Sequence, residues 1–273
     1  MGGSILVTGC SSGIGLHCAR RLAHDGWRVT ATARKEADLA MLRGEGLHAV
    51  YLDYTEPASI REAFASAMEH HDGRIDALFN NGAYGQAGAV EDLPTEALRA
   101  QFEANFFGWH ELTNLAVPVM RRQGAGRIVH CSSILGFVAY PWRGGYNASK
   151  FALTGLAWTM RLELKGSGVH VSLIEPGPIE SKFTSNGVPH FLKWIDQENS
   201  VHRKRYAKEL ARLESNGGVN RFRLGPEAVY QVLDHALNAK RPKAHYQVTT
   251  PTKMMAVAKR LLPINALDRL LGK

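Results

Sequence analysis

The fold of this chain is most constrained by a regular alternation of short apolar runs and helix-length segments between Ser4 and Ile174. Strands are predicted at residues 4–8, 28–33, 47–52, 75–80, 127–132 and 169–174. Helices are predicted between them at residues 13–24, 60–68, 96–120 (interrupted near Pro118) and 146–164. Repeated strand–helix units of this length build a parallel sheet with helices on both faces. The alternation therefore predicts a single α/β domain over residues 1–250, with the Rossmann-like, doubly wound architecture.

The pattern changes after Pro178. Residues 179–223 are polar, basic and helical, with aromatic residues interspersed, and they follow the end of a predicted strand. Because doubly wound sheets bind ligands beyond the carboxyl ends of their strands, we expect this segment to be a lid over the substrate site. The alternative is a surface excursion that serves stability alone. A helix at residues 226–237 and a strand at residues 246–248 are expected to complete the sheet.

Composition places the chain among globular proteins, since 45% of its 273 residues are hydrophobic and 21% are charged. It contains no apolar run of about 18 residues, which a transmembrane helix requires. The strand that begins at Ser4 leaves no room for a leader peptide, so a cytoplasmic location is expected. Cys10, Cys18 and Cys131 are expected to be free thiols rather than a disulfide framework. The twelve histidines show no metal-binding spacing, so no metal is expected.

The net charge of +8 is concentrated near the C-terminus, where residues 240–273 contain eight Lys or Arg and one acidic residue, Asp268. Residues 251–273 form a basic, partly amphipathic tail that Pro263 breaks. An ordinary solvated surface is the simplest interpretation, and contact with an anionic membrane surface is the minority alternative. Nucleic acid is not expected as a partner, because no aromatic platform or binding motif accompanies the charge.

A glycine-rich turn joins the first predicted strand to the first predicted helix, and it reads Thr8-Gly9-Cys10-Ser11-Ser12-Gly13-Ile14-Gly15. Gly9 permits a tight turn, Gly13 lets the backbone approach a phosphate, and Gly15 lets helix and sheet pack closely. The helix N-terminus favours an anionic pyrophosphate through its free N–H groups and its dipole. Glycines also end strands for conformational reasons alone. The place of this turn in a strand–helix–strand unit nevertheless predicts a dinucleotide site.

The end of the second predicted strand indicates which dinucleotide binds. NAD sites of this kind carry an acidic residue there, which accepts hydrogen bonds from the ribose. This chain has Arg34 and Lys35 instead, and a guanidinium pairs well with the 2′-phosphate of NADP. We therefore expect NADP(H), with NAD as the weaker alternative, although Arg34 is also interpretable as an exposed base at a strand end. Asp53 is expected either at the adenine amino group or as a cap near Thr55.

Tyr146 and Lys150 are four positions apart, which places both side chains on one face of a helix. An ammonium beside a phenol favours the phenolate and so lowers the tyrosine pKa. Such a tyrosine can exchange protons with a substrate near neutral pH. Any exposed helix can carry this pair. Here, however, Ser133 lies thirteen positions upstream of Tyr146 and the dinucleotide turn opens the chain.

Together these residues resemble the short-chain dehydrogenase/reductase family over residues 4–250. The glycine turn is similar to the family's TGxxxGxG motif, and Asn80-Asn81-Gly82-Ala83 is similar to its Asn-Asn-Ala-Gly motif, with the last two residues reversed. Asn105 resembles the family's helix asparagine, and Ser133 has the family's spacing from the tyrosine. Pro176-Gly177 resembles the Pro-Gly after the sixth strand. The threonine that often follows it is absent, and Ser181 or Thr184 is the candidate substitute.

Residues 8–17 and 175–183 further resemble the branch that contains 17β-hydroxysteroid dehydrogenases, retinol dehydrogenases and bacterial NADP-dependent aldehyde reductases. The resemblance implies an oxidoreductase that transfers hydride reversibly between NADP(H) and a carbonyl/alcohol pair. It also implies a homodimer or homotetramer, with the helices near residues 96–120 and 146–164 at the interface.

The resemblance implies a role for each site residue. Tyr146 would exchange the proton, Lys150 would lower its pKa and hold the nicotinamide ribose, and Ser133 would bind the substrate oxygen. Asn105 would hold a water in a proton relay with Lys150. The cofactor would contact the turn, the strand ends and the Pro-Gly pair, through Gly9, Ser11, Ser12, Gly13, Ile14, Gly15, Arg34, Asp53, Asn81, Gly82, Ala83, Tyr146, Lys150, Pro176 and Gly177. Taken singly, Ser133 is interpretable as a strand-end cap, Asn105 as bonding its own helix turn, and Tyr146 as packing.

Three functions stay open. The preferred one is NADP(H)-dependent reduction of small or medium aldehydes and ketones, because the expected lid is mostly polar and basic. The second is the same chemistry on a steroid or retinoid, which the aromatic lid residues, the basic tail and the apolar loop 136–142 favour. The third is a sensor that binds NADP(H) without turnover, and the intact set of Ser133, Tyr146 and Lys150 argues against it.

Overall fold

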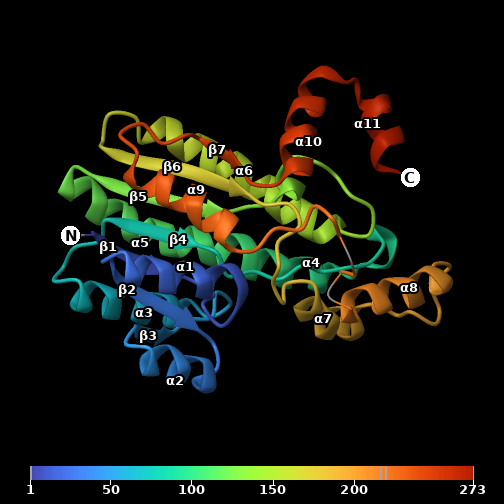
Figure 1. Ribbon diagram of the computed structural model, residues 1–273. Helices are drawn as coiled ribbons and strands as arrows, with labels where there is room; N and C mark the ends of the chain where they lie inside the picture. Colours follow the sequence, from blue (N-terminus) through green and yellow to red (C-terminus); the bar gives the residue numbers. More distant parts are fainter. Residues whose placement is uncertain (1, 216, 219, 273) are drawn as a thin grey trace.

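The computed structural model describes residues 2–215, 217–218 and 220–272. Within them, seven parallel strands form one sheet in the order β3-β2-β1-β4-β5-β6-β7 (Figure 1). The strands are β1 (Ser4–Val7), β2 (Arg28–Ala33), β3 (His48–Tyr51), β4 (Ala77–Asn80), β5 (Gly126–Cys131), β6 (Val169–Glu175) and β7 (His245–Gln247). From β1 the chain first adds β2 and β3 on one side, and then crosses to add β4 and the later strands on the other side, as in Rossmann-like sheets. The predicted single α/β domain with a parallel sheet is therefore confirmed.

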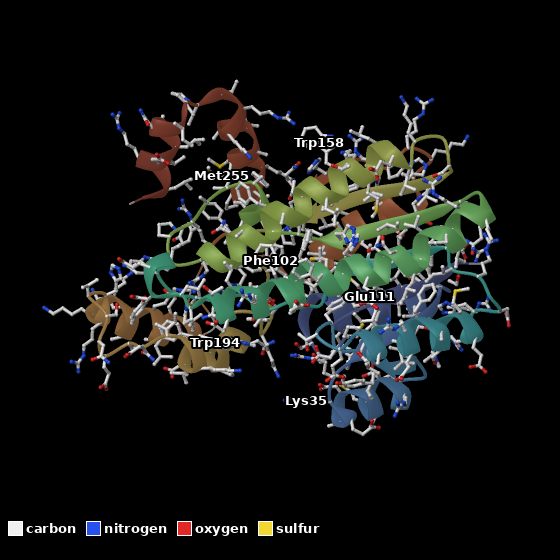
Figure 2. All side chains as sticks on the ribbon, turned by 180° about the vertical axis from the view of Figure 1, so that it is seen from behind. Lys35, Phe102, Glu111, Trp158, Trp194 and Met255 are labelled. Carbon is white, nitrogen blue, oxygen red and sulfur yellow. The ribbon has the colours of Figure 1, made fainter. Side chains whose placement is uncertain are left out.

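Helices cover both faces of the sheet (Figures 1 and 2). On one face, α1 (Gly13–His24) packs against α9 (Glu227–Asn238). On the other face lie α3 (Pro57–His70), α5 (Gly108–Gln123) and α6 (Gly144–Glu163). Strands covered on both faces are apolar throughout their length. This is why the fully buried strands β1 and β4 were predictable from their sequences alone.

Two helical regions differ from the prediction. The expected helix at residues 96–120 is α4 (Thr95–Phe102), a π-helical turn η2 (Glu103–Phe107) and α5. The interruption thus lies at η2, and α5 continues through Pro118. The sequence pattern also missed α2 (Glu36–Gly44), whose buried side chains are only Leu39 and Leu42, too few to show a helical period.

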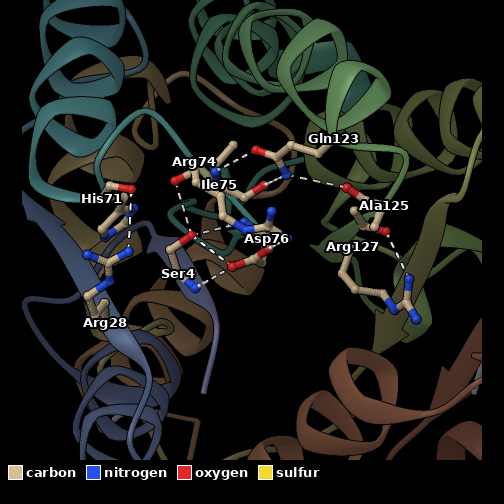
Figure 3. Close-up of polar contacts among 10 residues, drawn as sticks. Ser4, Arg28, His71, Arg74, Ile75, Asp76, Gln123, Ala125 and Arg127 are labelled. Carbon is tan, nitrogen blue, oxygen red and sulfur yellow. Dashed lines mark hydrogen bonds and ion pairs between the residues drawn. The ribbon is translucent and has the colours of Figure 1, made fainter. Parts of the chain in front are cut away.

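Polar side chains fasten the edge of the sheet at which the strands begin (Figure 3). The backbone N of Ser4 donates to Asp76 Oδ2 at 2.8 Å, and Ser4 Oγ donates to the Arg74 carbonyl at 3.1 Å. The Gln123 amide bonds both backbone groups of Ile75, at 3.0 and 2.9 Å. These bonds join the start of β1, the residues before β4 and the end of α5. They hold the starts of β1 and β4 beside each other and beside the end of α5.

The described residues between 179 and 223 lie beyond the carboxyl ends of the strands (Figure 1). They contain a 3-10 turn η4 (Ser185–Gly187), α7 (Val188–Trp194) and α8 (Arg203–Glu214). A cluster of buried side chains separate from the main core packs this segment, and it comprises Ala87, Ala89, Phe191, Ile195, Tyr206 and Leu213. The expected domain begins at Met1, the expected lid includes Asn216 and Val219, and the expected tail ends at Lys273. These four residues lie outside the described part of the chain.

The tail consists of α10 (Thr250–Leu261) and α11 (Ile264–Leu271), which Pro263 separates as predicted. Both helices extend away from the sheet (Figure 1), and Met255 of α10 lies on the same side of the molecule as Trp158 of α6 (Figure 2). Among the described residues, we find no helix with the length and apolar character needed to cross a membrane.

Candidate active site

Two adjoining cavities open where the strands end. The first, of about 160 Å³, is lined by the turns after β1, β2, β3 and β4. The second, of about 380 Å³, is lined by the residues after β5 and β6 together with α6 and α8. The two cavities share Ile14, Asn81, Ala83, Ser181 and Phe183. A ligand that occupies the first cavity can therefore reach the second without crossing the main core.

The glycine turn shapes the first cavity with its backbone. Gly9 and Gly13 have left-handed φ angles of 68° and 57°. A Cβ at Gly9 would lie 2.6 Å from the Gly82 Cα, and a Cβ at Gly13 would lie 2.8 Å from the Ser181 Cβ. A Cβ at Gly15 would lie 2.2 Å from the Gly9 carbonyl oxygen. Only glycine fits these three positions without strain.

The N-terminus of α1 faces the first cavity. Its N-cap Ser12 makes no side-chain capping bond in the described structure, and both Ser11 and Ser12 line the cavity. Asn81 holds the turn in place, because its backbone N donates to Thr8 Oγ1 at 2.8 Å and its Nδ2 donates to the Thr8 carbonyl at 3.1 Å. An uncapped helix N-terminus offers N–H groups and a positive dipole end to an anion. These residues fit the pyrophosphate of a dinucleotide.

The ends of β2 and β3 bring a cation and a carboxylate to the same cavity. Arg34 is mostly exposed, and its Nη1 lies 3.5 Å from Asp53 Oδ2. Asp53 Oδ1 accepts hydrogen bonds from the backbone N and the hydroxyl of Thr55, both at 2.9 Å. Of the two interpretations of Asp53, the local cap at Thr55 is the one that its bonds show. Both Arg34 and Asp53 line the cavity.

Ser133 and Tyr146 both line the second cavity. Ser133 follows β5 and caps a 3-10 turn η3 (Ile134–Gly136), where its Oγ accepts a hydrogen bond from the Leu135 N at 3.1 Å. Tyr146 lies in the first turn of α6, and its ring centre is 5.4 Å from that of Phe183. Burial raises the pKa of Tyr146, and a hydrogen bond with Ser133 opposes this rise. The cap predicted as an alternative for Ser133 exists, and it does not remove the residue from the cavity.

Lys150 is buried one turn after Tyr146. Its Nζ donates to the Cys131 carbonyl at 3.0 Å, and lies 4.0 Å from the Trp109 ring centre and 5.8 Å from that of Tyr146. Burial lowers the pKa of Lys150 to about 8. The expectation that Lys150 lowers the Tyr146 pKa stays a prediction, because the shift in this arrangement arises mainly from burial. Removing a phenol from water disfavours its phenolate.

Asn105 is fully buried in η2 and does not line either cavity. Its Nδ2 donates to the Tyr84 carbonyl at 2.9 Å and to Ser149 Oγ at 3.4 Å, and its Oδ1 accepts from the Tyr84 N at 3.3 Å. The interpretation that Asn105 bonds its own helix turn is wrong. Its amide instead joins Tyr84, in the loop after β4, to Ser149 of α6, which lies three positions after Tyr146.

Pro176 and Gly177 line the second cavity. A Cβ at Gly177 would lie 2.2 Å from Thr249 Oγ1, so the close packing of the chain after β6 requires glycine there. Ser181 and Thr184, the two candidate substitutes for the absent threonine, also line this cavity, and Ser181 lines the first cavity as well. The position between the cavities therefore favours Ser181 as the substitute.

Trp109 and the polar network beside it were not predicted from the sequence. Trp109 is fully buried, and its Nε1 donates to the Gly82 carbonyl at 2.9 Å while its face contacts the Lys150 ammonium. His130 bonds the Asn80 amide through Nδ1 at 3.2 Å, and burial lowers its pKa to about 3, so it is neutral. Trp109 lies four positions after Asn105, and residues at this spacing share one face of a helix. This spacing is the sequence signal that could have identified Trp109 as part of the site.

Comparison with known proteins agrees with this geometry. Residues 4–190 match the sequence model of the short chain dehydrogenase family. The chain is 39% identical to the uncharacterized oxidoreductase YbbO of Escherichia coli K12, over 98% of this chain and 93% of that protein. It is 34% identical to human 17-beta-hydroxysteroid dehydrogenase type 1 and 31% identical to human retinol dehydrogenase 8, over 90% and 89% of this chain and 77% and 80% of theirs.

Solved structures show the same fold. An actinorhodin polyketide ketoreductase variant with NADPH matches at a TM-score of 0.73 and 27% identity, over 90% of this chain and 95% of that one. A short chain dehydrogenase/reductase of Burkholderia phymatum in complex with NAD matches at 0.76 and 25% identity, over 95% and 92%. This chain is therefore an oxidoreductase of the short-chain dehydrogenase/reductase family.

Proposed function

We propose that the protein is an NADP(H)-dependent oxidoreductase that interconverts a carbonyl compound and its alcohol. One observation carries the proposal: Ser133, Tyr146 and Lys150 line one cavity, which meets a glycine-walled cavity fit for a dinucleotide. A bound nicotinamide supplies or accepts the hydride. The protein has to position the substrate and move one proton, and these three side chains are suited to both tasks.

Tyr146 donates its phenolic proton to the carbonyl oxygen in the reductive direction, and takes a proton from the alcohol in the oxidative direction. Because burial raises its pKa, Tyr146 holds that proton at neutral pH and is ready to act as an acid. The Ser133 hydroxyl donates a hydrogen bond to the same oxygen and stabilises the negative charge that develops there. Lys150 binds the nicotinamide ribose through its ammonium. We assign Asn105 a positioning role in place of the water-holding role, because Tyr84 and Ser149 engage its amide.

The cofactor that we propose is NADP(H). Arg34 lines the first cavity at the end of β2, and no acidic residue stands at that strand end. The Asp53 carboxylate faces Arg34 and is held by Thr55, so it orients the guanidinium. Related structures have been solved with NADPH and with NAD, which makes Arg34 the feature on which this choice depends. We propose that the N-terminus of α1, at residues 11–14, contacts the cofactor phosphates.

We propose that residues 179–223 act as the lid of the substrate cavity. The segment contributes Ile179, Phe183 and Thr184 to the lining, together with residues of α8 that include Leu213. The cavity volume lies in the range of small-molecule sites. Because α8 adds polar and charged groups, we favour small or medium aldehydes and ketones as substrates. A steroid or retinoid is the second candidate, and the likeness to 17-beta-hydroxysteroid dehydrogenase type 1 and retinol dehydrogenase 8 favours it.

The test follows NADPH and NADH oxidation by absorbance across carbonyl compounds, from short aldehydes to retinal and ketosteroids. Turnover with NADPH and one size class is the expected result, and that size class decides between the two substrate candidates. Tight NADPH binding without turnover of any carbonyl would favour a cofactor sensor instead. Turnover that requires NADH and not NADPH would refute the cofactor assignment.

We propose that the protein assembles as a homodimer or homotetramer through the outer face of α6. Phe151, Trp158 and Leu162 are 42%, 57% and 58% exposed, and their spacing places them along one face of the helix. Light scattering after size exclusion tests this, with Trp158→Lys as the variant expected to release protomers. A wild-type protein that elutes as a monomer would contradict the proposal.

A further inference from the structure

One wall of the second cavity is strongly cationic, whereas other parts of its lining are apolar. Four arginines line it, namely Arg143, Arg205, Arg212 and Arg223. Among the described residues that line it, Glu209 carries the one carboxylate. Even with Glu209 fully ionised, the arginine side chains leave a surplus of positive charge at this wall. Lys150, on the catalytic side of the same cavity, adds to that surplus.

Glu209 organises this wall rather than neutralising it. The side chain is 5% exposed, and it bonds both Arg143, which precedes α6, and Arg212. Arg212 reaches it through Nε at 3.1 Å and Nη2 at 2.8 Å. One carboxylate thus fixes two guanidinium groups, one of them from another element of the fold. A guanidinium held in this way presents its remaining N–H donors in a fixed direction.

Arg205 belongs to the same face of α8 and has a different environment. Residues 205, 209 and 212 are spaced by four and three positions, which places them along one side of the helix. Among the described residues, Arg205 makes no salt bridge, and its guanidinium lies 5.3 Å from the Trp142 ring centre. Trp142 also lines the cavity, and it has a left-handed φ of 66°. A non-glycine residue in this conformation is a strained feature of the kind that binding sites contain.

We propose that the second cavity takes a carbonyl substrate that carries an anionic group, a carboxylate or a phosphate, which the Arg205–Arg212 face of α8 binds. This inference rests on the proposed function and names its substrate class. The dinucleotide phosphates do not explain the wall, because α8 does not line the first cavity. The part of the chain that matches the family model does not contain the wall either, since that match ends at residue 190, before α8 begins.

The experiment compares pairs of aldehydes that differ in charge. One pair is 4-oxobutanoate and its neutral methyl ester, and the other is glyceraldehyde 3-phosphate and glyceraldehyde. For each pair, the ratio of kcat/KM for the anionic to the neutral member is measured with NADPH in the wild type, Arg205→Met and Arg212→Met. Lys208→Met is the matched control, because Lys208 is an exposed cation on α8 that does not line the cavity.

The wild type is expected to prefer the anionic member of at least one pair by about tenfold or more, as for one charge-assisted hydrogen bond. Arg205→Met, at an exposed position where misfolding is not expected, should bring this ratio close to one, and Lys208→Met should leave it unchanged. The pair that shows the preference identifies carboxylate or phosphate as the group bound. Equal ratios in the wild type and Arg205→Met would overturn the proposal, as would a loss of NADPH affinity with no change in the ratio.

A second measurement separates this proposal from the proposed function. Calorimetry with butanedioate, which has no reducible carbonyl, is performed in the presence of NADP⁺, with butanediamide as the neutral control. Binding of butanedioate that Arg205→Met weakens, but not Lys208→Met, supports the anion site even if no aldehyde is turned over. If neutral aldehydes are reduced and neither butanedioate binding nor an anion preference is seen, the oxidoreductase assignment stands and the anion site does not.

Discussion

The glycine turn contributes backbone to the wall of the first cavity, whereas side chains from α6, α8 and the loops around them line the second. In the first, Gly9 and Gly13 stand where any Cβ would collide with the chain. In the second, the arginines of α8 and the ring of Trp142 define the part of the space that the first cavity does not share. A backbone wall suits a ligand with constant parts, such as a pyrophosphate, while a side-chain wall can change its specificity by substitution.

The two regions also differ in how they are packed. The sheet that carries the first cavity shares one large core with α1, α3, α5 and α9. The segment that contributes α8 to the lining of the second cavity rests on a separate cluster of a few buried residues around Phe191 and Tyr206. Regions with few buried apolar contacts open locally at a lower free energy than the core. The substrate side is therefore expected to move while the cofactor side stays fixed.

The largest effect is expected at the chemical centre, where both regions meet. Tyr146→Phe removes the proposed proton donor and should lower kcat/KM by about 10²–10⁴-fold while NADPH affinity stays nearly the same. Steady-state kinetics and a fluorescence titration of NADPH measure the two quantities. Tyr51→Phe is the control, because Tyr51 is 40% exposed and bonds only Glu56 among the described residues. Retained turnover in Tyr146→Phe would refute the assignment of the donor.

The difference in packing is tested by truncating one leucine in each core. Leu22→Ala, in the fully buried face of α1, should lower the free energy of unfolding by about 2–5 kcal/mol. Leu213→Ala should instead accelerate hydrogen exchange in α7 and α8, with a smaller change in the global unfolding free energy. Denaturant titration and exchange mass spectrometry provide the two readouts. Equal global losses with no local change in exchange would show that the two cores unfold as one.

Gly13 is where the glycine turn touches the lid segment. Gly13→Ala places a Cβ 2.8 Å from that of Ser181 and forces alanine into a left-handed conformation. We expect weaker NADPH binding by about tenfold, from roughly 1–2 kcal/mol of backbone strain. Gly44→Ala, in α2 with nothing within 4 Å of its Cβ, should bind NADPH like the wild type. Unchanged affinity in Gly13→Ala would mean that this wall is less rigid than its geometry indicates.

The smallest effect is expected at the exposed end of the first cavity. Arg34→Gln should lower the ratio of kcat/KM for NADPH to that for NADH by about fivefold, through the loss of one exposed charge-assisted contact of about 1 kcal/mol. Lys35→Gln removes a neighbouring cation that does not line the cavity, and should change the ratio less. If both variants shift the ratio equally, general electrostatic attraction rather than a specific contact selects the cofactor.

The difference between the cavities also decides what the sequence could predict. The sheet, the glycine turn and the Tyr146–Lys150 pair were predictable because each is a short-range pattern with a fixed spacing. The direction of the Tyr146 pKa was not, since it depends on burial by residues distant in sequence. The Glu209 bond to Arg143 was missed for the same reason, because Arg143 and Glu209 are 66 positions apart. The π-helical turn at Asn105 was missed because no residue type marks it.

The small cluster that holds the lid segment has a consequence for the order in which the protein is built. The Ala89 N–H donates to the Tyr206 hydroxyl at 3.1 Å across 117 positions. As the chain emerges during synthesis, the strands and turns of the first cavity are available well before Tyr206. Closing a loop of this length carries an entropic cost that only the finished cluster offsets. The wall of the second cavity around Tyr206 is thus expected to form after the strands and turns that begin the first cavity have already emerged.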